Sequence, residues 1–255
     1  MTEVPSVLIT GAAKRIGRFI AVDLAKRGWR VAVHYHRSAH DAEDVVAEIT
    51  GCGGTAVALA ADLAQEAETA TLVDRASAAI GPLTALINNA SVFETDRAET
   101  VTRMSWDQHM EVNLRAPFVL TQTFAQALPP ALTGNVINIL DQRVWNLTPY
   151  FTSYTVSKVG LWTLTQTLAM ALAPSVRVNA VGPGPTLPSA RQTEESFQRQ
   201  WSALPLARQV RPEEIAAAVR FILDAPSVTG QMIAVDAGQH LGWSQGCART
   251  GPADE

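Results

Sequence analysis

The chain has 255 residues, a formal net charge of −4 and 47% hydrophobic residues. This length and apolar content suit one large α/β domain, and the acidic balance argues against nucleic acid or an anionic membrane as a partner. No apolar run reaches membrane-spanning length, and a first strand beginning by Ser6 leaves no room for a signal peptide. Two cysteines are too few for a disulfide framework, so we expect a cytoplasmic protein. Five histidines show no metal-ligand spacing, so no metal is expected.

Short apolar runs alternate with amphipathic helical segments along the chain. We expect strands at 6–10, 30–35, 55–60, 84–88, 135–140, 176–181 and 231–236, and helices at 16–27, 41–50, 66–80, 105–128, 152–173 and 212–224. This order predicts a single Rossmann-type domain over residues 1–255, with a doubly wound parallel sheet flanked by helices. A polar helix at 189–201 lies within a proline-bounded segment, so we expect residues 183–205 to form a substrate lid and 244–255 a flexible tail.

The first strand runs into a turn with the spacing TGxxxxxG, which begins at Thr10. Glycines at the turn and at the helix start let backbone amides and the helix N-terminus approach a pyrophosphate. The spacing is looser than the GxGxxG fingerprint, because Lys14-Arg15-Ile16 stand where small residues could be. The predicted phosphate site consists of Gly11, Lys14, Arg15, Ile16 and Gly17.

The end of the second strand indicates which nicotinamide cofactor binds. In this position an acidic side chain would bind the ribose 2′-hydroxyl of NAD, but the chain reads His36-Arg37-Ser38 and has no carboxylate before Asp41. Arg37 and Ser38 can donate hydrogen bonds to a 2′-phosphate. We therefore expect NADP(H) as the cofactor.

Tyr154 and Lys158 stand four residues apart in a predicted helix, so they share one face. A nearby ammonium favours the phenolate and can lower a tyrosine pKa by roughly one to three units. The pair is thus a candidate proton donor. Asp141 precedes the tyrosine by thirteen residues, at the end of the fifth strand.

Further strings complete the motif set of one family. They are Asp62-Leu63, Leu86-Ile87-Asn88-Asn89-Ala90-Ser91, Val112-Asn113-Leu114 and Asn179-Ala180-Val181-Gly182-Pro183-Gly184. Together with TGxxxxxG and YxxxK they make the chain resemble the short-chain dehydrogenases/reductases over roughly residues 5 to 240. The resemblance implies that Asn113 holds a water that links Lys158 to solvent. It also implies cofactor contacts from Asp62, Leu63, Asn89, Ala90, Lys158, Pro183, Gly184 and Thr186.

Within that family the chain is most similar to the pteridine reductases, including bacterial dihydromonapterin/dihydrofolate reductases. The likeness rests on TGAAKRIGR at 10–18, HYHRSA at 34–39, NNASVF at 88–93 and the Asp141-to-Tyr154 spacing. A generic family member would carry glycine and serine where this chain has Ser91 and Asp141. The likeness implies a pterin substrate and a homotetramer. It leaves two alternatives for Trp243, which either shapes a neighbouring subunit's pocket or belongs to a frayed tail. It implies substrate contacts from Arg15, Ser91, Phe93, Asp141 and Tyr154.

The residue type at position 141 favours a pterin over a ketone. A serine hydroxyl donates a hydrogen bond to a carbonyl oxygen, whereas an ionised aspartate only accepts one. We expect hydride transfer to a pterin C=N bond, with Tyr154 or a water as proton donor, Asp141 orienting or reprotonating that donor, and Asn113 closing the relay.

Two other functions remain open on the sequence alone. An NADPH-dependent carbonyl or 3-oxoacyl reductase would need a hydroxyl in place of Asp141, and the nearby Thr148 and Ser153 have the wrong spacing to Tyr154 for that role. A non-catalytic NADP(H)-sensing regulator would be expected to have lost its tyrosine, lysine or asparagine, and all three are present.

Overall fold

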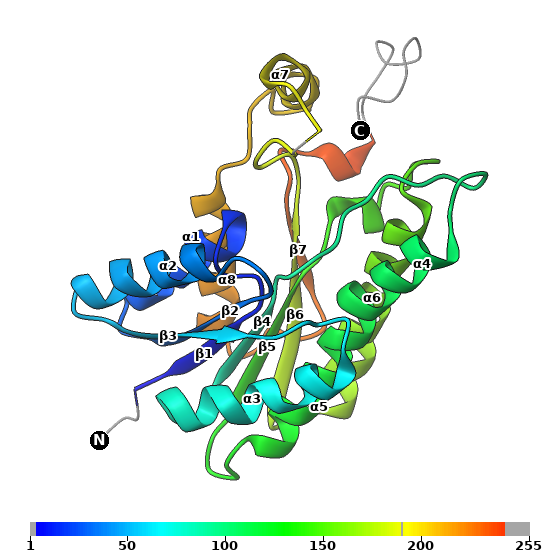
Figure 1. Ribbon diagram of the computed structural model, residues 1–255. Helices are drawn as coiled ribbons and strands as arrows, with labels where there is room; N and C mark the ends of the chain where they lie inside the picture. The colour runs from blue at the N-terminus through cyan, green and yellow to red at the C-terminus, as the bar shows by residue number, and fades with distance from the viewer. Residues whose placement is uncertain (1–3, 190, 243–255) are drawn as a thin grey trace.

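The computed structural model describes residues 4–189 and 191–242, which form a parallel sheet with helices on both faces (Figure 1). The strands are β1 (Ser6–Ile9), β2 (Arg30–Tyr35), β3 (Thr55–Ala60), β4 (Ala85–Asn88), β5 (Gly134–Ile139), β6 (Val176–Pro183) and β7 (Met232–Val235). The helices are α1 (Arg15–Ala25), α2 (Ala39–Gly51), α3 (Glu66–Ile80), α4 (Arg103–Met110), α5 (Ala116–Ala127), α6 (Thr152–Ala171), α7 (Glu194–Ser202) and α8 (Pro212–Asp224). The predicted α/β class and the doubly wound sheet are confirmed.

The strand order, β3-β2-β1-β4-β5-β6-β7, fixes where a ligand can bind. The chain moves outward from β1 to β3, crosses back to β4 beside β1, and then moves outward in the other direction. Ligands of open parallel sheets bind outside the carboxyl ends of the strands at such a reversal point. The loops that follow β1 and β4 are therefore the first place to look for a site.

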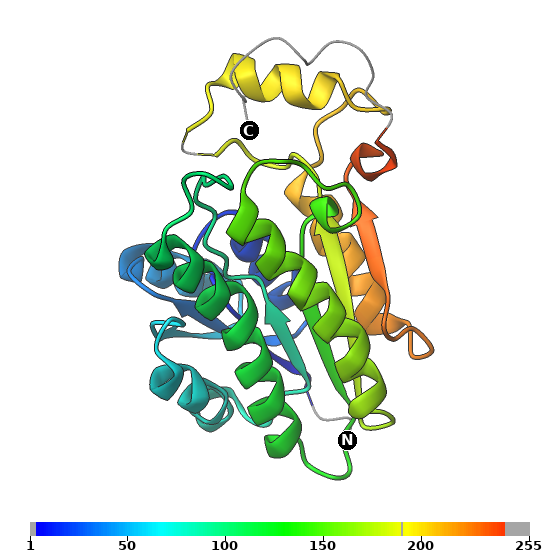
Figure 2. The ribbon, with the colours of Figure 1, turned by 90° about the vertical axis from the view of Figure 1, so that its right-hand side faces the viewer.

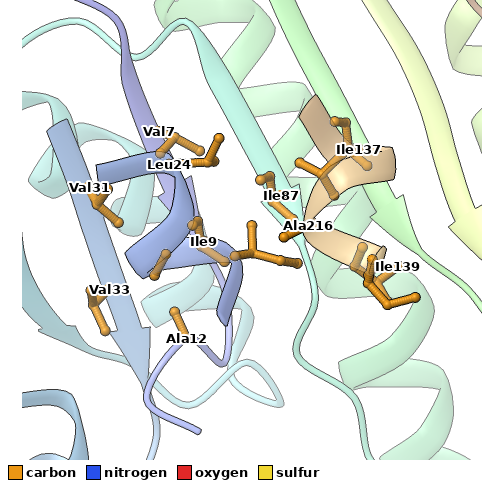
Figure 3. Packing of buried hydrophobic residues seen from close by; sticks show 14 of the residues in the cluster. Val7, Ile9, Ala12, Leu24, Val31, Val33, Ile87, Ile137, Ile139 and Ala216 are labelled. Carbon is orange, nitrogen blue, oxygen red and sulfur yellow. The ribbon is translucent and has the colours of Figure 1, made fainter. Parts of the chain in front are cut away.

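Alternate residues of each strand pack on opposite faces, as the period of two requires. In β1, Val7 and Ile9 join the cluster beneath α1, α2 and α8, whereas Leu8 joins the cluster beneath α3, α5 and α6. Figure 3 shows the first cluster, in which side chains of β1, β2, β4 and β5 meet Leu24 of α1 and Ala216 of α8. Apolar packing on both faces holds the strand ends in register around the site.

The helix that we predicted at 105–128 is interrupted. A π-helical turn covers Glu111–Arg115 between α4 and α5, and the backbone N–H of Ala116 donates to the carbonyl of Glu111. Pro117 lacks the N–H that a regular α-helix would donate to the carbonyl of Asn113. The proline thus gives a physical reason for the changed hydrogen-bond pattern at the predicted functional asparagine.

The segment at 183–205 lies beyond the carboxyl ends of β6 and β7, where α7 runs across the top of the molecule (Figure 2). Its helix begins at Glu194 rather than at the predicted Ser189, because the side chain of Thr193 caps it by accepting from the backbone N–H of Ser196. Trp243 and the expected tail at 244–255 lie outside the described residues. Within the described part of the chain, no helix is long and apolar enough to cross a membrane.

Candidate active site

The turn between β1 and α1 forms a cradle of backbone atoms. Gly11 has φ 61°, and its N–H donates to Nδ1 of the buried His34 at 3.0 Å. A Cβ on Gly17 would lie 2.5 Å from the side-chain amide nitrogen of Asn89 and 2.5 Å from the carbonyl oxygen of Gly11. Lys14 precedes α1 without a side-chain cap. Because no side chain caps the first turn of α1, its amide groups are available to a phosphate.

The loop after β4 is hydrogen-bonded to this cradle. Asn89 donates from its side chain to the carbonyls of Thr10 (2.8 Å) and Gly11 (3.1 Å). The hydroxyl of Thr10 in turn accepts from the backbone N–H groups of Asn89 (2.9 Å) and Ala90 (3.0 Å). The two loops on either side of the reversal point therefore form one hydrogen-bonded unit.

Asn113 extends the unit to α6. Its side chain is fully buried, where Oδ1 accepts from the backbone N–H of Val92 (2.8 Å) and Nδ2 donates to the carbonyl of Val92 (2.9 Å) and to Ser157 Oγ (3.1 Å). Ser91 Oγ also donates to Asn113 Oδ1, at 3.3 Å. The asparagine side chain thus anchors the loop after β4 against α6, and it makes no direct hydrogen bond to Lys158.

Tyr154 and Asp141 are in contact. The tyrosine Oη donates to Asp141 Oδ2 at 3.0 Å, and Asp141 Oδ1 accepts from the backbone N–H of Arg143 at 2.7 Å. Burial, and then the negative charge of Asp141, raise the pKa of Tyr154 well above its ordinary value, while Arg143 acts in the opposite direction. The phenol is accordingly protonated at neutral pH and donates to the carboxylate.

Lys158 is buried on the same helix face. Its Nζ donates to the carbonyl of Ile139 at 2.9 Å and lies 5.8 Å from the centroid of the Tyr154 ring. Burial lowers the pKa of Lys158 to about 8, although the charge of Asp141 opposes this change. Our prediction that Lys158 lowers the pKa of Tyr154 is therefore wrong, because burial and the adjacent carboxylate determine that pKa.

Arginine side chains connect the segment at 183–205 to the rest of the site. Arg15, with φ 52°, donates to the carbonyls of Leu187 (3.1 Å) and Pro188 (2.8 Å). Arg191 donates to the carbonyl of Phe93 and pairs with Glu94, both at 3.2 Å. The guanidinium of Arg15 therefore bonds to the segment that we predicted as a lid, and Arg15 links that segment to the turn that forms the phosphate cradle.

These elements enclose a cavity of about 740 Å³, a size typical of small-molecule sites. The cavity brings together Gly11, Lys14, Arg15, Ile16, Gly17, Asn89, Ala90, Ser91, Phe93, Asp141, Tyr154, Lys158, Pro183, Gly184 and Thr186. Asn113 supports the cavity wall from behind. The other five predicted residues, His36, Arg37, Ser38, Asp62 and Leu63, follow β2 and β3 and do not line the cavity.

The end of β2 fits a phosphorylated ribose. His36 and Arg37 are exposed. Nε2 of His36 lies 3.7 Å from Asp62 Oδ2, whereas Arg37 has no ion pair with the described residues. Asp41, the nearest carboxylate in the sequence, is bound by Lys14 at 2.9 Å, and this hydrogen bond lowers the pKa of Asp41. A positive side chain therefore remains available where a 2′-phosphate would lie.

The sequence did not indicate the contacts of three buried groups in or behind the cavity wall. His34 binds Gly11 N–H and the carbonyl of Ala61, and burial lowers its pKa to about 4, so it is neutral. Ser153 donates to Asp96 and contacts His109, which joins α6 to α4. Arg143 borders the cavity. The only signal for Arg143 was its position two residues after Asp141.

Comparisons with known proteins agree with this geometry. A family model described as "Enoyl-(Acyl carrier protein) reductase" matches residues 11–240. A "Short-chain type dehydrogenase/reductase" from Picea abies is 31% identical, with 91% of each chain covered. The chain belongs to the short-chain dehydrogenase/reductase family. A 3-oxoacyl-[acyl-carrier-protein] reductase from Synechocystis sp., another member, is 32% identical, with 91% of this chain and 95% of that protein covered.

A solved structure is more similar than these relatives. FolM alternative dihydrofolate reductase 1 from Brucella canis, complexed with NADP, is 48% identical, with a TM-score of 0.92 and coverage of 96% of this chain and 97% of that one. This likeness, together with the fit of the cradle and of the β2 end, supports an NADP(H)-dependent oxidoreductase of this family.

Proposed function

We propose that the protein uses NADPH to reduce a pterin C=N bond, converting a dihydropterin to a tetrahydropterin, with dihydrofolate and oxidised pterins as further candidate substrates. The observation that carries this proposal is the hydrogen bond from Tyr154 Oη to Asp141 Oδ2, at 3.0 Å. A carboxylate beside the tyrosine repels a carbonyl oxygen. It can, however, orient a proton donor toward a basic ring nitrogen.

In the proposed reaction, each residue of the site has a separate role. NADPH, when bound, would supply the hydride to the ring carbon. Tyr154, by turning its single O–H from Asp141 toward the substrate, or a water in contact with it, would give a proton to the adjacent ring nitrogen. A proton from solvent, passed through Asp141, would then restore the phenol and its hydrogen bond to the carboxylate. Lys158 would hold the nicotinamide ribose, and Asn113 keeps the loop after β4 against α6.

Cofactor contacts follow from the same placement. We assign the pyrophosphate to the cradle around Gly11 and Gly17, and the adenosine end to His36, Arg37, Ser38, Asp62 and Leu63. Phe93 presents a ring at the cavity wall, suited to stacking on a flat substrate. Residues 183–205 act as the lid, because Arg15 and Arg191 connect that segment to the cavity rim.

Two likenesses support different substrates. The neighbour that is 48% identical is named a dihydrofolate reductase, whereas the Synechocystis relative is named a 3-oxoacyl reductase. The second function needs a hydroxyl beside Tyr154. Ser153 is fully buried and bound to Asp96 and His109, and Thr148 is exposed and donates to the carbonyl of Tyr150. Neither hydroxyl borders the cavity, so we favour the pterin.

The test is steady-state oxidation of NADPH with 7,8-dihydropterins, dihydrofolate, and a panel of ketones and 3-oxoacyl thioesters at equal concentration. Turnover confined to pterins and folates is expected. Turnover confined to ketones or 3-oxoacyl compounds would overturn the proposal, and NADPH binding without any turnover would favour the regulator. The resemblance to tetrameric reductases also leads us to propose a homotetramer, which light scattering after gel filtration tests.

A further inference from the structure

Arg143 has no role in the proposed mechanism, although it borders the cavity beside Asp141 and Tyr154. It belongs to the 3₁₀ turn Gln142–Val144 directly after Asp141, and its side chain borders the same cavity as Tyr154 and Phe93. The residue is 9% exposed. A charged side chain buried to this degree is ordinarily paired with an acid or fully hydrogen-bonded.

The guanidinium has rings around it instead. Its central carbon lies 4.6 Å from the ring centroid of Phe151, 5.8 Å from that of Phe93 and 5.9 Å from that of Tyr154. Contacts of this kind hold the planar group in place by cation–π attraction. They use the faces of the guanidinium and not its N–H groups, which point outward in the plane of the group.

Arg143 makes no side-chain hydrogen bond or ion pair with the residues that the structure describes. Its Nε and Nη1 are buried without a partner. The carboxylate of Asp141 is bound to Tyr154 and to the backbone N–H of Arg143, and Glu94 is paired with Arg191. Since Asp141 and Glu94 have other partners, a substrate bound in the cavity that Arg143 borders can supply an acceptor for this guanidinium.

We propose that Arg143 is a specificity-determining residue that donates hydrogen bonds to an oxygen acceptor of the substrate, next to Tyr154. The acceptor is either a carbonyl oxygen of a flat ring or a carboxylate of its side chain. Both chemistries suit a rigid, planar donor that stacked rings hold in place. This inference rests on the proposed function, and it adds which edge of the substrate is recognised.

The test compares Arg143→Met and Arg143→Lys with wild type. Methionine fills the space among the rings without charge or donors, and lysine keeps the charge but not the planar fork. Arg97→Met is the matched control, because Arg97 also stacks on a ring, 4.8 Å from the centroid of Tyr150, but is exposed and away from the cavity. KM and kcat are measured with a dihydropterin that lacks carboxylates and with dihydrofolate, and NADPH affinity by fluorescence.

Loss of charged hydrogen bonds should raise KM about 10- to 100-fold in Arg143→Met, with NADPH affinity within about twofold of wild type and Arg97→Met unchanged. An increase for both substrates assigns the acceptor to the ring, and an increase for dihydrofolate alone assigns it to the carboxylates. An unchanged KM for both, in a folded Arg143→Met variant, overturns the proposal.

Failure of the proposed function gives a different pattern. If the wild type reduces only ketones or 3-oxoacyl compounds, the pterin assignment fails whatever Arg143 does. The same comparison of KM between wild type and Arg143→Met on those substrates then decides the role of Arg143. A rise of tenfold or more retains it as a substrate donor, and equal KM values refute that role.

Discussion

Replacing Asp141 with asparagine isolates the feature on which the chemistry depends. The amide keeps the size of the side chain, and its oxygen can still accept from the backbone N–H of Arg143. The interaction that is lost is the ionic hydrogen bond with Tyr154 Oη, at 3.0 Å. A hydrogen bond to a charged group contributes about 1.5–3 kcal/mol. At about 1.4 kcal/mol per factor of ten, kcat/KM for a dihydropterin should fall roughly 10- to 100-fold.

The assay is NADPH oxidation at saturating cofactor, with the dissociation constant of NADPH measured separately by fluorescence. Cofactor affinity should stay within about twofold, because the Asp141 side chain bonds to Tyr154 and to the backbone of Arg143 and not to the cradle after β1. Asp107→Asn, on the exposed surface of α4, is the matched control and should leave both quantities unchanged. Equal losses of cofactor affinity and of kcat/KM in Asp141→Asn would refute the reasoning, as would an unaltered kcat/KM.

Three further changes test other parts of the site. Gly17→Ala should weaken NADPH binding at least tenfold in titrations, because its Cβ would lie 2.5 Å from the Asn89 side chain; unchanged affinity would contradict the cradle. The pKa of Lys158, about 8 in the folded chain against 10.5 ordinarily, means that the unfolded chain binds more protons between pH 8 and 10. The contribution of Lys158 to the free energy of unfolding should therefore rise by roughly 2–3 kcal/mol between pH 8 and 10. Urea unfolding at several pH values in this range should show that the Lys158→Met variant lacks this rise. Ser153→Ala should lower the free energy of unfolding by about 1–3 kcal/mol, because buried Asp96 loses a donor, while kcat changes less than about threefold; a collapse of kcat alone would indicate a catalytic hydroxyl.

The sheet and most helices could be predicted because their signals are local. Each buried strand is a short apolar run between turn residues, and the structure reproduces every predicted strand within one or two residues. The π-helical turn escaped prediction, because the hydrophobic pattern continues through it. Pro117, which cannot donate to the carbonyl of Asn113, was its only local sign.

In the candidate site, too, the features with a local sequence signal could be predicted and those that depend on the tertiary fold could not. The glycine turn, the YxxxK pair and the carboxylate at Asp141 each follow from spacing within one segment. The surroundings of Arg143 do not, because Phe93 follows β4 and Phe151 precedes α6, and only the folded sheet brings their rings to the same guanidinium. The raised pKa of Tyr154 is likewise caused mainly by burial. The burial of one side chain depends on the tertiary structure and cannot be read from the adjacent residues in the sequence.

The hydrogen bonds that run from Thr10 through Asn89 to the loop after β4, and from Asn113 to Ser157, have a consequence for affinity. When a dinucleotide binds to a flexible loop, the entropic cost of ordering that loop reduces the binding affinity. Here the conformational entropy of the loop is lost when the chain folds. The cofactor therefore meets a surface already in its binding shape, and a larger share of each phosphate contact is expressed as affinity.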